Sequence, residues 1–206
     1  MNSRTTYESV RVAAGTDRDE TLAVLRSAFA ADPFVGWLFP DPATRDDLQT
    51  RFYLPLLSHP RAETTLLGTG EAAAIWLSLA PGQSPFGDIE DAGDTGDTEA
   101  AFGDNAARLA IAGEHLAERH PTGSAHHYLA VMGVVPGAQG TGLGSVLLRH
   151  GLARADAEGV GSYLEASTAG SRQLYLRHGF ADLGEPVHLP DGPTLWPMWR
   201  EPGTTR

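Results

Sequence analysis

Apolar residues recur along the chain with two periods, and each change of period marks a predicted element. Spacings of three and four residues predict amphipathic helices after Thr16, around Leu48 and Phe102, and over 143–157 and 171–178. Runs that alternate or stay apolar predict strands at 10–14, 63–67, 72–79, 128–135, 162–166, from Phe180 onward and at 194–200. This succession predicts an α/β fold (an α+β mixed sheet), with a central twisted sheet of about six to seven strands and helices on both faces.

Local signals set the ends of the first helices. Thr16 and Asp19 have the spacing of a capping box, and Asp32-Pro33 predicts where that helix stops. The stretch that follows, DPFVGWLFPDP, is too short and too aromatic for an ordinary connector. We therefore predict a helical turn there that lines a site.

The chain of 206 residues predicts one domain over 1–206, with tails at 1–8 and 201–206. No internal repeat and no long linker divides it. Residues 81–98 are polar, glycine-rich and acidic, with an aspartate at every third position from Asp88 to Asp97. A calcium loop places its oxygens at alternate positions, so we predict a mobile surface loop there instead.

Composition removes several classes of function. The chain has no cysteine, which excludes disulfides and a cysteine nucleophile. Its formal charge is −11 at pH 7 and all 15 basic residues are arginine, which argues against a nucleic-acid partner. No apolar run reaches membrane-spanning length, and the first residues carry no secretory pattern. We predict a cytoplasmic protein with no membrane contact and, without an HExxH pattern, no metal.

The stretch VMGVVPGAQGTGLGSVLL joins a predicted strand to a predicted helix through a glycine-rich turn. The first amides of a helix have no intrahelical partner, and Gly140, Gly142 and Gly144 let an anion approach them. Ser145 adds a hydroxyl. The dinucleotide fingerprint would need glycine at Ser145, and a Walker loop would need a lysine, which the chain lacks. A turn without a ligand is the remaining alternative.

The turn from Gln139 to Gly144 reads Q-x-x-G-x-G after an apolar strand that ends in GVVP. Together with YLEAST, LYLRHGF, AAAIWLS and LPDGPTLWPMW, it resembles the GNAT superfamily of N-acetyltransferases, most densely from Tyr128 to Phe180. Within the superfamily the chain is most similar to puromycin N-acetyltransferases and related actinobacterial enzymes. The resemblance implies a GNAT-like fold, acetyl-CoA as co-substrate, and transfer of its acetyl group to an amine.

The resemblance assigns the coenzyme to two segments. The pyrophosphate is expected on the turn formed by Gln139, Gly140, Thr141, Gly142, Leu143, Gly144 and Ser145. The pantetheine arm and acetyl carbonyl are expected on free backbone groups of Met132, Gly133 and Val134. Gly133 suits a close approach of the ligand or, alternatively, a bulge. Many members carry an asparagine that contacts the pantetheine where this chain has Ser171, which is expected to substitute, and Arg172 lies near the expected path of the phosphates.

Two side chains are candidates for proton transfer. The resemblance implies that Tyr175 protonates the departing sulfur, since a phenol with a pKa of about 10 holds its proton at neutral pH. Glu165 corresponds to a catalytic glutamate of some members and is the candidate base. A core tyrosine and a surface glutamate are the structural alternatives. Without a cysteine or a G-x-S-x-G elbow, direct attack by the amine in a ternary complex is expected.

The acceptor is expected between the N-terminal aromatic segment and the sheet. Phe34, Trp37, Tyr53 and Trp76 are candidates for a flat or apolar amine pocket, although each is also an ordinary core residue. They favour a primary amine of a small molecule, with a peptide or protein amine as the alternative. A non-catalytic acyl-CoA-binding module and an NAD(P)-dependent oxidoreductase are the alternative classes. Superfamily members often dimerise, which makes a homodimer one option for this chain.

Overall fold

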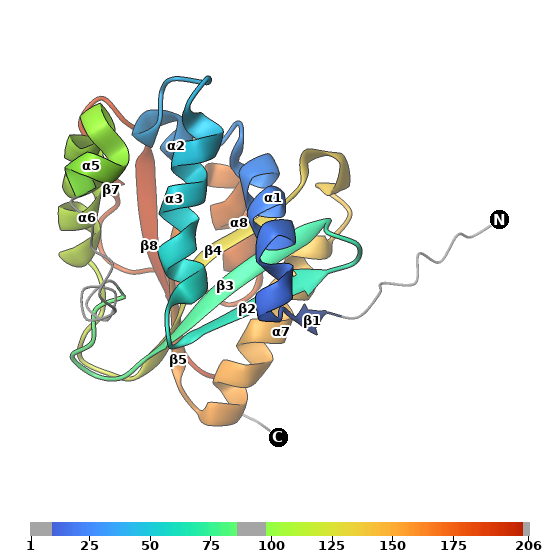
Figure 1. The fold of residues 1–206 in the computed structure, drawn as a ribbon. Helices are drawn as coiled ribbons and strands as arrows, with labels where there is room; N and C mark the ends of the chain where they lie inside the picture. The colour runs from blue at the N-terminus through green and yellow to red at the C-terminus, as the bar shows by residue number, and fades with distance from the viewer. Residues whose placement is uncertain (1–9, 86–97, 204–206) are drawn as a thin grey trace.

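One open sheet runs through the computed structural model, which describes residues 10–85 and 98–203 (Figure 1). The order of its strands is β1-β2-β3-β4-β5-β8-β6, and β7 pairs with β8. Neighbouring strands are antiparallel except β4 and β5, which are parallel. The strands are β1 (Arg11–Val12), β2 (Ala62–Leu67), β3 (Ala72–Leu79), β4 (His126–Val134), β5 (Gly161–Ala166), β6 (Ala181–Asp182), β7 (Val187–His188) and β8 (Thr194–Arg200).

Helices cover both faces of this sheet. α1 and α3 pack on one face, and α7 and α8 pack on the other (Figure 1). α2 and α6 share a separate apolar cluster with residues of β7 and β8. The helices are α1 (Arg18–Phe29), α2 (Pro33–Leu38), α3 (Arg45–Ser58), α5 (Thr98–Phe102), α6 (Ala106–Ala117), α7 (Leu143–Glu158) and α8 (Ala169–Arg177).

The predicted fold class is confirmed, and each predicted strand is present with small changes at its ends. In the described residues the sheet has eight strands rather than six to seven. The unpredicted one, β7, has only two residues, which is too short to display a period. Residues 86–97 of the predicted loop at 81–98 lie outside the described residues, as do residues 1–8 of the N-terminal tail.

The first helix begins differently from the prediction. A short 3-10 turn over Gly15–Asp17 precedes α1, and Asp17 takes the position before the helix. Its Oδ2 accepts a hydrogen bond of 2.7 Å from the Ala14 N–H, and no side-chain cap from Thr16 forms. The predicted capping box is therefore wrong, because a tight turn places Asp17 where a helical start at Thr16 was expected. The stop at Asp32-Pro33 lies near the real end of α1, at Phe29.

β4 leaves its parallel neighbour early, and this shapes the whole centre of the molecule. It pairs with β5 only from His126 to Tyr128 but continues to Val134. On its other edge the register with β3 shifts at Ala130, which is an extra residue without a Cα partner. A bulge of this kind bends and twists a strand. Beyond Tyr128 the backbone groups of β4 that point toward β5 therefore have no strand to pair with.

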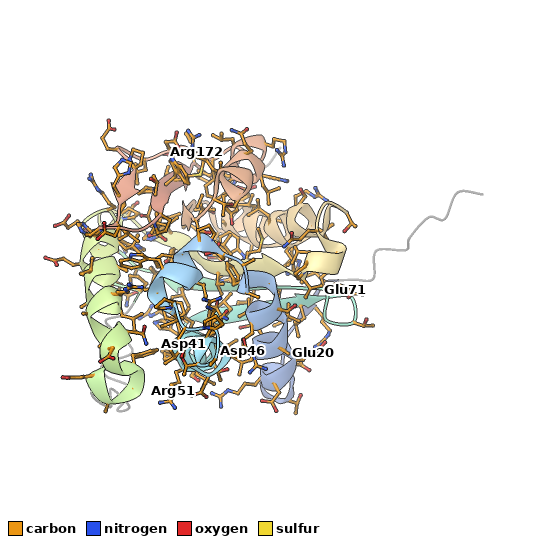
Figure 2. All side chains as sticks on the ribbon, turned by 90° about the horizontal axis from the view of Figure 1, so that it is seen from above. Glu20, Asp41, Asp46, Arg51, Glu71 and Arg172 are labelled. Atoms are coloured by element: carbon orange, nitrogen blue, oxygen red, sulfur yellow. The ribbon has the colours of Figure 1, made fainter. Side chains whose placement is uncertain are left out.

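Charged side chains lie at the periphery. Figure 2 shows Glu20, Asp46, Arg51 and Glu71 projecting away from the layers of the fold. Among the described residues, no helix combines the length and apolarity that crossing a bilayer requires. In the same residues no three His, Asp or Glu side chains gather as a metal site.

One close contact between α7 and β3 gives a direct test of this packing. Trp76 is 1% exposed, and a Cβ added at Gly151 would lie 2.3 Å from its Cε2. We expect Gly151→Ala to lower the free energy of unfolding by about 1–3 kcal/mol, because the indole has no room to move. Urea denaturation followed by circular dichroism measures this change.

The matched control is Gly36→Ala on α2, where nothing lies within 4 Å of an added Cβ. It should be neutral or stabilising, because alanine is favoured over glycine in a helix by about 1 kcal/mol. Unchanged or greater stability of Gly151→Ala would contradict the packing described here.

Candidate active site

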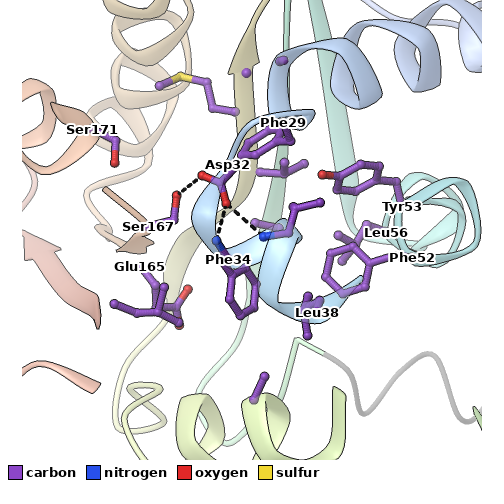
Figure 3. Close-up of a pocket in the computed structure, with 18 of the residues that line it drawn as sticks. Phe29, Asp32, Phe34, Leu38, Phe52, Tyr53, Leu56, Glu165, Ser167 and Ser171 are labelled. Carbon is purple, nitrogen blue, oxygen red and sulfur yellow. Dashed lines mark hydrogen bonds between the residues drawn. The ribbon is translucent and has the colours of Figure 1, made fainter. Parts of the chain in front are cut away.

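A cavity of about 690 Å³ lies where β4 and β5 diverge (Figure 3). Its walls come from the end of α1, from α2, α3 and α6, from β4, and from the end of β5 with the start of α8. Most of the lining is apolar. In the described lining the charged side chains are Asp32 and Glu165. The cavity is therefore mostly apolar and contains two acidic groups, a composition that is common in small-molecule sites.

The open edge of β4 offers backbone groups to this cavity. Val135 N–H donates to the carbonyl of Glu71 on the β3 side, at 2.9 Å. Partners alternate along an antiparallel strand, so the N–H groups of Met132 and Val134 point away from β3, toward the opening. The N–H of Gly133 points to β3. Two of the three predicted backbone positions are thus aligned with the cavity.

Gly133 is required by the packing of α1. A Cβ at this position would lie 2.6 Å from the Cβ of Ala28 and 2.9 Å from Cε2 of Phe29. Gly133 is thus closely approached, as predicted, but by side chains of α1 rather than by a ligand. The alternative of a bulge at Gly133 is wrong, because the bulge is at Ala130.

The glycine turn ends in unpaired amides at the start of α7. Gly140 and Gly142 have φ values of +76° and +92°, which favour glycine. Val146 N–H makes a bond of 3.1 Å to the carbonyl of Gly142. In the described residues, no acceptor lies within hydrogen-bond range of the N–H groups of Gly140, Gly142, Leu143, Gly144 and Ser145. With the dipole of α7 behind them, these groups favour an anion.

Side chains of the turn hold its shape. Gln139 Nε2 donates to the carbonyl of Val134 at 3.1 Å and so ties the turn to β4. Thr141 Oγ1 donates to the carbonyl of Ala138 at 2.6 Å. These bonds fix the backbone that carries the free amides.

The first turn of α7 is anchored against α8. Ser145 Oγ lies 3.1 Å from Nε2 of His178, so its hydroxyl has a partner within the protein. A Cβ at Gly144 would lie 3.4 Å from Cδ2 of Leu174. Leu143 packs into the apolar cluster beneath α7. An added Cβ at position 144 would therefore make only an ordinary van der Waals contact, and the packing of α7 on α8 does not itself require glycine there.

Glu165 stands on the cavity wall at the end of β5. The hydroxyl of Tyr128 donates to its Oε2 at 2.9 Å. Burial raises the pKa of Glu165 to about 7, although the hydroxyls of Tyr128 and Tyr163 lower it. The alternative of a solvated surface glutamate is wrong, because this carboxyl group is partly buried and faces the cavity.

Tyr175 lines the same cavity from α8 and is 6% exposed. Its pKa is raised by burial and, to a smaller extent, by the negative charge of Asp32. Asp32 precedes α2 as its N-cap. Its Oδ1 accepts the N–H groups of Phe34 and Val35 at 2.9 and 3.1 Å, and its Oδ2 accepts the Ser167 hydroxyl at 2.8 Å. Figure 3 shows this carboxylate between α2 and the end of β5.

Two predicted coenzyme contacts are engaged elsewhere. Ser171 lies at the cavity, but its hydroxyl donates to the carbonyl of Thr168 at 2.9 Å and caps α8. Arg172 pairs with Asp182 through both Nε, at 2.8 Å, and its terminal nitrogen. Neither side chain is free in the way that the sequence suggested.

The four aromatic candidates for the acceptor pocket separate into three groups. Phe34 and Tyr53 line the cavity. Trp37 stacks on Phe34 with ring centroids 6.4 Å apart, and its Nε1 donates to the carbonyl of Pro190, so it supports the wall from behind. The prediction for Trp76 is wrong. Strand alternation turns its indole to the α7 face, away from the cavity.

Three site residues were missed by sequence reasoning. Asp32 was visible only as a helix stop, although aspartate before Pro33 is also a typical N-cap signal. Tyr128 was counted only as a strand residue. Ser167 carried no signal, because its partner Asp32 is 135 positions away in the chain.

Comparisons with known proteins agree with this geometry. Residues 100–180 match the family model described as the acetyltransferase (GNAT) family. A structure from Corynebacterium glutamicum, described as histone acetyltransferase HPA2 and related acetyltransferase, is 29% identical with a TM-score of 0.70. That match covers 97% of this chain and 99% of the other.

Two further structures share the fold at lower identity. Arylalkylamine N-acetyltransferase 2 from Aedes aegypti has a TM-score of 0.67 at 16% identity, with 94% of this chain and 98% of that chain covered. The ribosomal-protein-S18-alanine N-acetyltransferase from Escherichia coli has a TM-score of 0.56 at 18% identity, with 96% of each chain covered. Together with the family match over residues 100–180 and the sheet that diverges at β4 and β5, they show that the chain has the fold of GNAT acetyltransferases.

Proposed function

We propose that this enzyme transfers the acetyl group of acetyl-CoA to a primary amine of a small molecule, by direct attack within a ternary complex. The proposal rests on two features that occur together, the free N–H groups at the start of α7 and the open edge of β4. The diphosphate would bind the N–H groups of Gly140, Gly142, Leu143, Gly144 and Ser145. The pantetheine arm would follow Met132 and Val134 toward Glu165 and Tyr175.

Acetyl-CoA supplies an electrophilic thioester carbon, and the protein must stabilise the charge that develops on its oxygen. The N–H groups of Met132 and Val134 are fixed donors at the open edge of β4. One preorganised donor of this kind is worth about 2.7–4 kcal/mol in the transition state. Because the cavity is largely apolar, water competes weakly for the same oxygen.

Glu165 is proposed as the general base. Its pKa of about 7 means that near neutral pH it is half ionised and able to accept a proton from an ammonium group. Tyr175 is proposed as the acid for the departing thiolate. Burial and Asp32 raise its pKa, so the phenol keeps its proton until a strongly basic sulfur requires it.

A small-molecule acceptor is favoured because the acceptor wall is apolar and belongs to the same cavity as Glu165. The chain resembles puromycin N-acetyltransferases in sequence, and a fold neighbour is an arylalkylamine N-acetyltransferase. A peptide or protein amine is the second candidate acceptor, since another neighbour is named for a ribosomal-protein alanine.

Release of free thiol from acetyl-CoA tests the function directly. The assay compares aromatic amines, polyamines, amino acids and N-terminal peptides as acceptors. Acetyl transfer to small amines supports the proposal, whereas transfer to peptides alone selects the second candidate. Tight acetyl-CoA binding with no thiol release from any amine would make the chain a non-catalytic binding module.

Gly142→Val should abolish acetyl-CoA binding, because a β-branched residue is strained at a φ of +92° and covers the free amides. Isothermal titration calorimetry measures the affinity. Gly137→Ala is the matched control in the same turn, since its φ is not positive and nothing lies within 4 Å of an added Cβ. Unchanged affinity of Gly142→Val would remove the turn from the coenzyme site.

Tyr175→Phe should lower kcat by about 10²-fold, the lower end of the range for a single proton-transfer group. Acetyl-CoA affinity should be retained, because the phenyl ring keeps the apolar contacts of the tyrosine. Steady-state kinetics and calorimetry separate the two effects. Full turnover in this variant would exclude Tyr175 as the acid.

The pH profile of kcat/KM should rise with pH and level off above about 7, because Glu165 must lose its proton to act as a base. Tyr128→Phe removes the hydroxyl that lowers the pKa of Glu165, so the inflection should move to higher pH. Glu165→Gln should flatten this limb of the profile. An inflection that stays in place in Glu165→Gln would assign the titration to another group.

A further inference from the structure

The cavity carries negative charge and no positive charge in its described lining. Its charged side chains are Asp32 and Glu165, and no arginine or histidine lines it. A ligand that brings its own carboxylate would add a further acidic group to an apolar space whose described lining offers no cationic side chain. Burying an unpaired charge is strongly unfavourable, so this lining discriminates against anionic groups.

The carboxyl group of Asp32 can still accept a hydrogen bond from a donor in the cavity. A carboxylate has about four lone-pair sites. Phe34 N–H, Val35 N–H and the Ser167 hydroxyl occupy three of them. One site, on Oδ2, is left for a donor, and the three bonds hold the group in place between α2 and β5 (Figure 3).

Two tyrosine hydroxyls near Asp32 have no hydrogen-bond partner among the described residues. Tyr53 is 1% exposed and Tyr175 is 6% exposed, and both line the cavity. Within the described residues, neither hydroxyl makes a hydrogen bond. Both hydroxyls therefore remain available to a ligand that enters the cavity. Figure 3 shows the Tyr53 hydroxyl directed to the same space as Asp32.

The rest of the acceptor wall suits a bulky apolar body. Phe34, Phe52 and Leu56 face the cavity from α2 and α3, and Leu109 and Gly113 face it from α6. At Gly113 nothing lies within 4 Å of an added Cβ, so the α6 wall leaves room for a ligand. A small polar amine would leave most of this surface uncovered.

We propose that the acceptor is a hydrophobic primary amine without an anionic group, and that Asp32 receives its ammonium while its body lies against α6 at Gly113. This rests on the proposed acetyl transfer and names the substrate class and the residues that select it. Asp32 and Tyr53 bind and orient the amine, and Glu165 remains the group that takes its proton.

A matched pair of acceptors tests the class. Phenylethylamine and phenylalanine differ by one carboxylate, and thiol release from acetyl-CoA reports acetylation of either. We expect kcat/KM for phenylethylamine to exceed that for phenylalanine by at least about 10²-fold, beyond the difference set by the pKa of the two amines. Equal use of the two would overturn the substrate class and leave acetyl transfer intact.

Asp32→Asn tests the recognition residue. Asparagine is also a good N-cap, so α2 should remain folded, which thermal unfolding checks. We expect KM for phenylethylamine to rise about tenfold or more and the preference over phenylalanine to shrink, with acetyl-CoA affinity unchanged. The control Asp46→Asn removes an exposed carboxylate outside the cavity and should retain the preference. An unchanged preference in Asp32→Asn would remove Asp32 from acceptor recognition.

Gly113→Leu tests the position of the acceptor body. We expect it to raise KM for phenylethylamine more than for the shorter ethylamine, because the new side chain fills the α6 wall. Glu114→Leu, on the exposed side of the same helix, is the control and should change neither. Equal effects on both amines would place the body elsewhere. If the wild-type protein binds acetyl-CoA but releases no thiol with any amine, the proposed function itself is rejected.

Discussion

The early separation of β4 from β5 is the constraint on which the site depends. Two strands that stayed paired to their ends would satisfy each other's backbone groups and leave no space between them. Here pairing stops at Tyr128, and the bulge at Ala130 turns β4 while α1 packs closely over Gly133. The end of α1 therefore holds the strand in its divergent course, and its Ala28 and Phe29 also line the cavity. Its free N–H groups and the cavity beside them are two consequences of one backbone geometry.

The same geometry would let a chain of charge −11 hold the anionic coenzyme that we propose. The overall field repels a diphosphate, so attraction must come from groups in direct contact with it. Amides at the start of a helix provide this without any basic side chain, and their effect is confined to the first turn. The pairing of Arg172 with Asp182 fits this interpretation, because the arginine nearest the expected path is committed within the protein. The acidic surface that is unfavourable for the coenzyme is favourable for a cationic acceptor.

Sequence patterns predicted the layers of the fold because apolar periods report which residues are buried together. They also located the glycine turn, since Gly140 and Gly142 occupy backbone conformations that other residues rarely adopt. Patterns failed to show which face of the sheet a side chain lies on, or which distant residue it contacts. Trp76 lies on the wrong face of β3 for the acceptor, and a list of aromatic residues contains no such information. Asp32 and Ser167 meet only after the chain has folded, so neither local spacing nor composition could pair them.

The two carboxyl groups of the cavity differ in their surroundings, and that difference separates their proposed roles. Asp32 accepts three hydrogen bonds, two of them from backbone N–H groups at the start of α2, which fix the position of its carboxyl group. Glu165 accepts a hydrogen bond from the Tyr128 hydroxyl, and its burial disfavours the charged form and raises its pKa to about 7. In the proposed reaction, the carboxyl group held at Asp32 binds the amine, and Glu165, whose pKa lies near neutral pH, removes the proton. In this order the amine binds as a cation, loses its proton to Glu165, and then attacks the thioester as a neutral amine.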